Sequence, residues 1–85
     1  MKHLNNWTVY LLRCSNGSLY CGVTTNLQKR IQQHNLGKGS KYTRAFGPVY
    51  LVIAKSGFNK KDAYRMEHYI KQLPKVKKIP FMETL

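Results

Sequence analysis

The strongest constraint on the fold is a hairpin signal near the start of the chain. Aromatic and β-branched residues fill Trp7–Arg13 and Leu19–Thr24, which is typical of two short strands. Between them lies the triplet Ser15-Asn16-Gly17, a turn signal whose glycine can take the left-handed conformation. The pattern predicts two antiparallel strands joined by a tight loop.

The length of this loop decides which face each tyrosine of the hairpin occupies. A two-residue loop would pair Arg13 with Tyr20 and put Tyr10 on the opposite face. A three-residue loop instead pairs Leu12 with Tyr20. Tyr10 then lies opposite Gly22, and both tyrosines share one face. We expect the three-residue loop.

Two helices are predicted from apolar spacing and from the residues at their ends. The first begins near residue 27 after a cap at Thr25 or Asn26, and it stops before Gly37. The second covers residues 60–73 and ends before Pro74. The side chains that we expect to be buried on these helices are Leu27, Ile31, Ala63, Met66, Ile70 and Leu73.

A near-continuous apolar run predicts a third strand over residues 49–55 and favours a central strand covered on both faces. Residues 37–48 are expected to form a loop with room for one helical turn, and residues 56–59 a turn. After residue 73 the chain is basic and then apolar, and Ile79, Phe81 and Leu85 are candidates to dock as a last short element.

The order strand, strand, helix, strand, helix predicts an α+β fold in which a small antiparallel sheet carries helices. A chain of 85 residues makes one domain, here residues 1–85, with a core over about 7–73 and a tail over 74–85.

The net charge of +12 is the feature of the composition that points to a partner. It favours a polyanion as partner, nucleic acid in particular. A role at a membrane surface is disfavoured because the basic residues are spread along the chain rather than gathered on one amphipathic helix. The longest apolar run, residues 49–54, is too short to span a bilayer.

The two cysteines indicate neither a metal site nor a disulfide. Cys14 and Cys21 lack a second pair of zinc ligands, and the three-residue hairpin loop makes them face opposite ways. The polar start of the chain, residues 1–6, carries no secretory signal. Reduced thiols in a cytoplasmic protein fit best.

Four side chains of this first half suit chemistry on a phosphate ester. Arg30 and His34 lie four residues apart on one helix face, close in sequence to Tyr10 and Tyr20. A guanidinium can donate two parallel hydrogen bonds to phosphate oxygens, and an imidazole can relay protons near neutral pH. The plain alternatives are a solvated helix arginine, strand aromatics and an exposed histidine at a helix end.

Glu67 is the acidic residue that best suits a metal ion, since the chain holds only 3 Asp and Glu and Glu67 borders the buried side of the second helix. Mg²⁺ typically takes one or two protein carboxylates together with waters and phosphate. The alternative is an ordinary pair with Lys71, one turn later.

A glycine-containing basic segment follows the first helix, and its aromatic and cationic residues suit phosphate contacts with base stacking. The expected nucleic-acid-binding residues are Lys29, Lys38, Lys41, Tyr42 and Arg44.

In these residues the chain resembles a GIY-YIG nuclease domain of the small stand-alone bacterial kind. The resemblance runs from Trp7 to about Leu73 and rests on the joint pattern, because each triplet alone is weak. The stretches that carry it are residues 7–14 (WTVYLLRC), 19–30 (LYCGVTTNLQKR), 34–35 (HN), 37–44 (GKGSKYTR) and 63–71 around Glu67.

The resemblance implies a three-stranded antiparallel sheet flanked by helices and a cleavage of phosphodiester bonds that needs Mg²⁺ or Mn²⁺. It also implies a role for each residue. Tyr10, in the first triplet, corresponds to a general base or water-positioning group, and Tyr20 is the tyrosine of the second triplet. Arg30 corresponds to the catalytic arginine, His34 to a position that holds His or Tyr, and Glu67 to the metal ligand.

The chain departs from the family pattern at several positions. Thr8 and Val9 replace Gly-Ile in the first triplet, and Cys21 replaces Ile in the second. Val23 stands where some repair-type relatives have lysine, and no asparagine follows Glu67. Fewer side chains are therefore available to stabilise the transition state, or the basic segment after the first helix supplies them.

The function expected from the sequence is that of a metal-dependent endonuclease-type domain acting on DNA, single-stranded or branched forms included. The alternative is a catalytically weak or inactive nucleic-acid-binding module on the same scaffold. A weaker third hypothesis is a protein partner of a larger nucleic-acid assembly.

Overall fold

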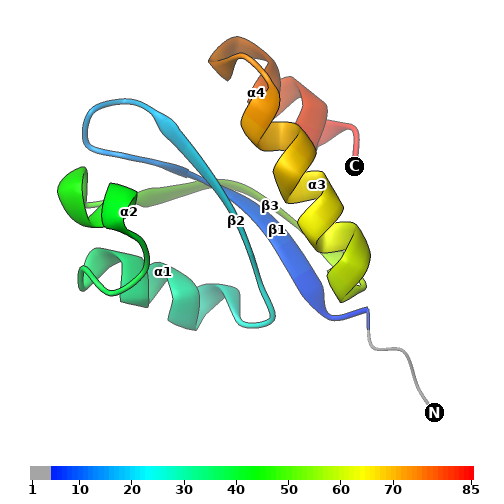
Figure 1. Cartoon of the computed structure of the whole chain (residues 1–85), viewed down its shortest axis with the longest axis horizontal. Coiled ribbons are helices and arrows are strands. Elements are labelled where there is room, and N and C mark those ends of the chain that lie inside the picture. The colour runs from blue at the N-terminus through cyan, green and yellow to red at the C-terminus, as the bar shows by residue number, and fades with distance from the viewer. Residues whose placement is uncertain (1–4) are drawn as a thin grey trace.

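A computed structural model describes residues 5–85; residues 1–4, which belong to the expected 1–85 domain and to its polar start, lie outside the described residues. The elements follow in the order β1 (Trp7–Arg13), β2 (Leu19–Thr24), α1 (Leu27–Asn35), α2 (Lys41–Ala45), β3 (Tyr50–Phe58), α3 (Lys60–Gln72) and α4 (Lys75–Glu83). The strands form one antiparallel sheet in the order β2-β1-β3, with the helices packed around it (Figure 1). The predicted α+β class, a three-stranded antiparallel sheet flanked by helices, is therefore confirmed.

The strand pairing confirms the three-residue hairpin loop. Leu12 lies opposite Tyr20 and Tyr10 lies opposite Gly22. Gly17 has a φ of +86°, the left-handed conformation that this loop needs and that glycine takes without a steric cost. Tyr10 and Tyr20 consequently share a face of the sheet.

The central strand is β1, and the prediction that the third strand is central is wrong. Four successive residues of β1, from Val9 to Leu12, are at most 1% exposed, because neighbouring strands and helices cover them on every side. β3 is an edge strand, and its Tyr50 and Leu51 are 67% and 45% exposed. An apolar run shows that a strand is largely buried but does not show how many neighbours it has.

The strand β3 is also longer than predicted, because residues 56–58 continue the pairing where a turn was expected. The chain continues through a register shift beside Gly57, whose φ is +98°. A second shift lies between Leu11 and Leu12 of the partner strand. Irregularities of this kind twist an exposed strand and limit its pairing with other chains.

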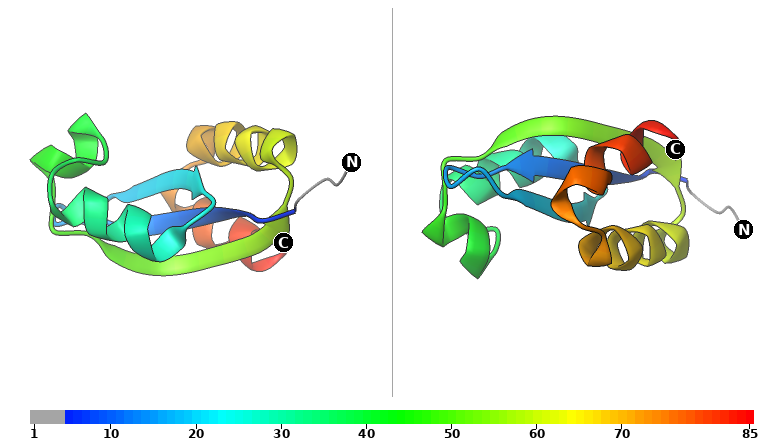
Figure 2. Two further views of the ribbon diagram at one scale, coloured as in Figure 1. Left: turned by 90° about the horizontal axis from the view of Figure 1, so that it is seen from below. Right: turned by 90° about the horizontal axis from the view of Figure 1, so that it is seen from above.

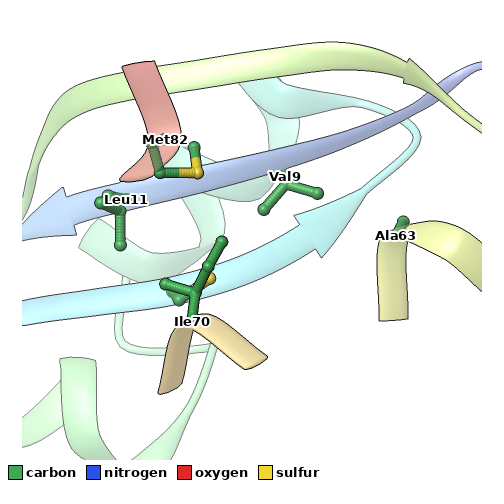
Figure 3. Close-up of a cluster of buried hydrophobic side chains, with 6 residues drawn as sticks. Val9, Leu11, Ala63, Ile70 and Met82 are labelled. Carbon is green, nitrogen blue, oxygen red and sulfur yellow. The ribbon is translucent and has the colours of Figure 1, made fainter. Parts of the chain in front are cut away.

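Alternate residues of β1 enter two hydrophobic clusters on opposite faces of the sheet. One face, covered by α3 and α4, buries Val9, Leu11, Cys21, Ala63, Ile70 and Met82 (Figure 3). The other face, which we call the tyrosine face, buries Tyr10, Leu12, Cys14 and Val49, with Leu27 and Ile31 of α1 packed against them. Figures 1 and 2 show α1 and α2 gathered apart from α3 and α4. Cys14 and Cys21 are free thiols in different clusters.

The helix ends follow from the residues beside them. Asn26, Ser40 and Asn59 cap α1, α2 and α3, each accepting a hydrogen bond from a backbone N–H three residues later. Near the end of the chain, Ile79 and Phe81 of α4 pack on the core and Met82 of the same helix is fully buried. Leu85, which follows the helix, also packs on the core. Across residues 5–85, none of the helices combines the length and the apolar character needed to cross a bilayer.

Candidate active site

The candidate site is built around a buried hydrogen bond between a tyrosine of β1 and a histidine of α1. The Tyr10 hydroxyl lies 3.0 Å from Nε2 of His34, and each of these residues is 1% exposed. Tyr10 points across the hairpin toward Gly22, where a Cβ would overlap the phenol. A glycine at this position of β2 is therefore what leaves room for the tyrosine ring.

The far side of the His34 ring is held by the segment that begins α2. Nδ1 of His34 lies 2.7 Å from Oγ1 of Thr43, which in turn lies 2.9 Å from Oγ of Ser40. Gly39 is so close to the imidazole that a Cβ there would overlap Nδ1. Both ring nitrogens thus have partners, and the ring cannot be an exposed helix-end histidine.

The pKa values of the pair favour neutral forms of both groups. Burial and then the charge of Arg30 lower the pKa of His34 to about 4. Burial raises the pKa of Tyr10 to about 12, while the guanidinium of Arg30 acts in the opposite direction. At pH 7 the phenol is therefore protonated and the imidazole uncharged.

The hydrogen bonds then fix the tautomer of the imidazole. The guanidinium of Arg30 can only donate to the phenol oxygen, so the phenol gives its own hydrogen to Nε2 of His34, 3.0 Å away. The hydrogen of the neutral ring must then lie on Nδ1 and be donated to Thr43, whose own hydroxyl can donate to the carbonyl of Ser40 at 3.4 Å.

Arg30 lies one helical turn before His34 and is half-buried beside the pair. Its guanidinium donates to Oε1 of Gln33 and to the carbonyl of Gly39, both at 3.3 Å. A guanidinium has five N–H donors, so this arrangement fixes Arg30 and leaves donors for an anion.

Tyr20 and Glu67 are joined to this group through Lys71. The ring of Tyr20 meets the ring of His34 at 5.3 Å between centroids and 66° between planes. The ammonium of Lys71 lies 5.4 Å from the centroid of the Tyr20 ring and 3.4 Å from Oε2 of Glu67. Glu67 is also among the charges that raise the pKa of Tyr10. The contacts therefore run without a break from α1, across β2, to α3.

A divalent cation, which the resemblance implies, has one suitable protein ligand in this arrangement. The side chain of Glu67 is 19% exposed, and it pairs with Lys71 at i+4 as the alternative interpretation expects. In residues 5–85 there is no group of three or more His, Cys, Asp or Glu side chains of the kind that would enclose a metal. One accessible carboxylate fits Mg²⁺ or Mn²⁺, which share their coordination with water and phosphate, better than it fits zinc.

The basic loop borders a hollow of its own. Lys38, Lys41 and Arg44 line a depression of ≈ 230 Å³ together with the backbone of residues 37–41. The carbonyl of Gly39, on this wall, is the same oxygen that accepts a hydrogen bond from Arg30. The loop cations therefore adjoin the arginine rather than forming a separate patch.

Tyr42 takes a more structural position than the sequence predicts. Its ring stacks on Tyr20 at 6.2 Å and 15°, and it meets Phe46 at 4.9 Å and 51°. Its hydroxyl lies 2.6 Å from Oγ of Ser18 in the hairpin loop. Tyr42 thus holds α2 against the hairpin. Lys29, also predicted to bind nucleic acid, is exposed on α1 and lines a groove next to Arg30.

Four residues with a clear place in this arrangement are missed by the sequence interpretation of the site. Gly22 and Gly39 leave room for the rings of Tyr10 and His34, Thr43 is the partner of Nδ1 of the imidazole, and Lys71 links Glu67 to Tyr20. Two of the four have a sequence signal, because the hairpin register predicts Gly22 opposite Tyr10 and helical spacing pairs Lys71 with Glu67.

Comparisons with known proteins agree on one family. The GIY-YIG catalytic domain family matches residues 6–79 of the chain. Among similar proteins, a UPF0213 protein of Oceanobacillus iheyensis is 48% identical over 75 residues, covering 88% of this chain and 87% of its own length. A UPF0213 protein of Neisseria meningitidis serogroup C is 45% identical over 74 residues, covering 87% and 81%.

Two solved structures are similar to this one. The solution structure of the UPF0213 protein BH0048 from Bacillus halodurans has a TM-score of 0.56 at 41% identity, covering 92% of this chain and 83% of that chain. The solution structure of the protein EF2693 from E. faecalis has a TM-score of 0.64 at 31% identity, covering 99% and 90%.

Proposed function

Because this chain belongs to the GIY-YIG catalytic domain family, we propose that it is a divalent-metal-dependent endonuclease. Its substrate is nucleic acid, with DNA favoured in single-stranded or branched form, and the net charge of +12 suits this polyanion. The observation that carries the proposal is the continuous set of contacts that joins Tyr10, His34 and Tyr20 to Glu67, with Arg30 beside them. Its two buried free thiols suit a reducing compartment, and we place the protein in the cytoplasm.

The Tyr10–His34 pair supplies the route for a proton. Since the pKa of Tyr10 is raised to about 12, the phenol does not act as a ready-made phenolate. Instead, its oxygen takes a proton from the attacking water while its own proton passes to Nε2 of His34. The imidazolium so formed keeps the Nδ1 hydrogen bond to Thr43, and the negative charge of a bound phosphodiester lowers the cost of its positive charge.

Arg30 and Tyr20 stabilise the charge that builds up on the phosphate. The free N–H groups of Arg30 donate to the nonbridging oxygens, and its hydrogen bonds to Gln33 and Gly39 hold it ready before substrate arrives. The hydroxyl of Tyr20 donates to the same group. Glu67 is the residue that would hold the cation, which when bound would neutralise charge on the phosphate and the leaving oxygen.

The test is hydrolysis of labelled single-stranded, duplex and branched DNA with Mg²⁺, with Mn²⁺ and with chelator. Removal of a group that acts in the transition state costs about 10²–10³-fold in rate, so we expect Arg30→Ala and Glu67→Ala to lose at least that much. The matched controls are Arg65→Ala and Glu83→Ala, which remove the same charges from exposed positions of α3 and α4. Intact substrates under every condition, or site variants that cut as well as the controls, would contradict the proposal.

One observation favours the second candidate function, a nucleic-acid-binding module without turnover. Tyr10 is 1% exposed, so a water molecule reaches its hydroxyl only if substrate binding opens the site. A binding module would show affinity that falls steeply with salt and is the same for wild type and Glu67→Ala. It would cut none of the substrates.

A further inference from the structure

A groove lies next to Arg30, on the side away from the basic loop. It has a volume of ≈ 530 Å³ and is lined by residues from the start of β1, the end of β2, α1 and α3. This size is within the range of about 300–1,000 Å³ that is usual for small-ligand sites. Arg30 lines this groove, and its hydrogen bond to the carbonyl of Gly39 connects it to a residue that lines the loop depression.

The walls of the groove differ in chemistry. Lys29 and Arg30 of α1 form a cationic wall, and Asn26 and Gln33 add amide groups to it. Trp7 and Tyr64 form an aromatic wall, with their ring centroids 5.5 Å apart and their planes at 57°. None of the residues that line the groove carries a carboxylate.

Tyr64 is also left partly uncovered by the fold. It is 47% exposed although it belongs to a helix with a buried side, and its ring contacts that of Trp7. An aromatic wall and two cations in one groove match a ligand that has a flat apolar part and an anionic part.

We propose that this groove is a nucleotide subsite, which binds the nucleotide next to the scissile phosphate. Its phosphate lies against Lys29 and Arg30, and its base packs against Trp7 and Tyr64. The assignment rests on the proposed function in one respect, because it takes Arg30 as the residue that binds the scissile phosphate. The base must be unpaired to reach the aromatic wall, since the edges and faces of a paired base are covered by its own helix.

Trp7 gives a direct reading of this contact because it is the only tryptophan in the chain. A base that packs on it will quench its fluorescence. The probes are thymidine 3′,5′-bisphosphate, the abasic deoxyribose 3′,5′-bisphosphate and inorganic phosphate, each titrated in chelator so that no turnover occurs. We expect saturable quenching by the thymidine compound, and affinity at least fivefold weaker for the abasic compound and for phosphate.

Substitutions test the contributions of the aromatic wall and of the cationic wall to binding separately. Tyr64→Ala should weaken binding of the thymidine compound about fivefold or more, since stacking is worth about 1–3 kcal/mol per base, and Tyr64→Phe should keep it. The matched control is Tyr69→Ala, which removes a tyrosine that is 49% exposed on the same helix but packs on Phe81 outside the groove. Lys29→Ala should weaken both bisphosphates, and Lys77→Ala, on α4, should weaken neither by a comparable factor.

Equal affinity for the thymidine and abasic compounds, or equal losses in Tyr64→Ala and Tyr69→Ala, would overturn the subsite. So would quenching that never saturates. These measurements need no cleavage, so a protein that binds as expected and cuts no DNA would refute the proposed endonuclease while leaving the subsite in place. Cleavage of DNA without base-dependent quenching would refute the subsite while leaving the proposed endonuclease in place.

Discussion

The buried imidazole of His34 should make the stability of the fold depend on pH in a way that can be calculated. The pKa of a histidine is 6.5 in the unfolded chain and is lowered to about 4 in the folded protein. Between these values the unfolded chain binds a proton that the folded protein does not, so the free energy of unfolding falls as pH falls. The stabilisation is complete above pH 6.5 and is lost by about pH 4.

The size of the effect follows from the same two values. The difference of about 2.5 pH units corresponds to about 3 kcal/mol at 1.36 kcal/mol per unit. That is a large part of the stability of a small domain. Urea unfolding at a series of pH values from 7 to 4 measures it directly. The chain also has two other histidines and 3 Asp and Glu residues, so the measurement needs a matched variant at position 34.

The matched variant is His34→Gln, which cannot take up a proton but keeps an acceptor and a donor at the site. Its unfolding free energy should fall by about 3 kcal/mol less than that of wild type between pH 7 and pH 4. If the variant is too unstable to compare, nitrogen NMR of the wild-type imidazole gives the same information. Parallel curves for the two proteins, or an imidazole that gains its proton near pH 6.5, would refute the reasoning.

Three further predictions concern the packing around the site and the core. Gly22→Ala should lower the unfolding free energy by about 1–3 kcal/mol in urea titrations, because its Cβ would overlap the buried phenol of Tyr10; no loss would mean that the ring moves freely. Thr43→Val should cost about 1–3 kcal/mol and shift the nitrogen NMR signals of the imidazole, since it leaves the ring N–H without an acceptor, whereas Thr43→Ser should change both far less. Met82→Ala should cost about 2–5 kcal/mol because Met82 is fully buried, and Val76→Ala, at a position 80% exposed on the same helix, should change stability by less than about 0.5 kcal/mol.

The hairpin shows why part of this structure can be predicted from the sequence. A three-residue loop with a left-handed glycine fixes the strand register, and the register alone puts Tyr10 and Tyr20 on one face. The spacing of Arg30 and His34 likewise follows from helical geometry, and Asn26 sets where that helix begins. These features depend on a few neighbouring residues, so local rules are sufficient for them.

The features that sequence reasoning missed depend on residues distant in the chain. The continuous apolar run of β3 predicts a central strand, yet in residues 5–85 β3 pairs with β1 alone and lies at the edge of the sheet. Thr43 has no local signal for contact with His34, because the two meet only after the loop of residues 36–40 folds back over the imidazole. A glycine is required at position 39 because a Cβ there would overlap the imidazole once this loop has folded back.

The position of β2 at the edge of the sheet explains how residues from both layers of helices reach one site. α1 covers the tyrosine face and α3 covers the opposite face, so side chains from the two helices can meet only around an edge of the sheet. Lys71 of α3 reaches the ring of Tyr20 in this way, past the unpaired side of β2. A fourth strand added beside β2 would separate Glu67 from Arg30 by a layer of backbone. The three-stranded order, with the hairpin at one edge, is therefore the property of the fold on which the proposed site depends.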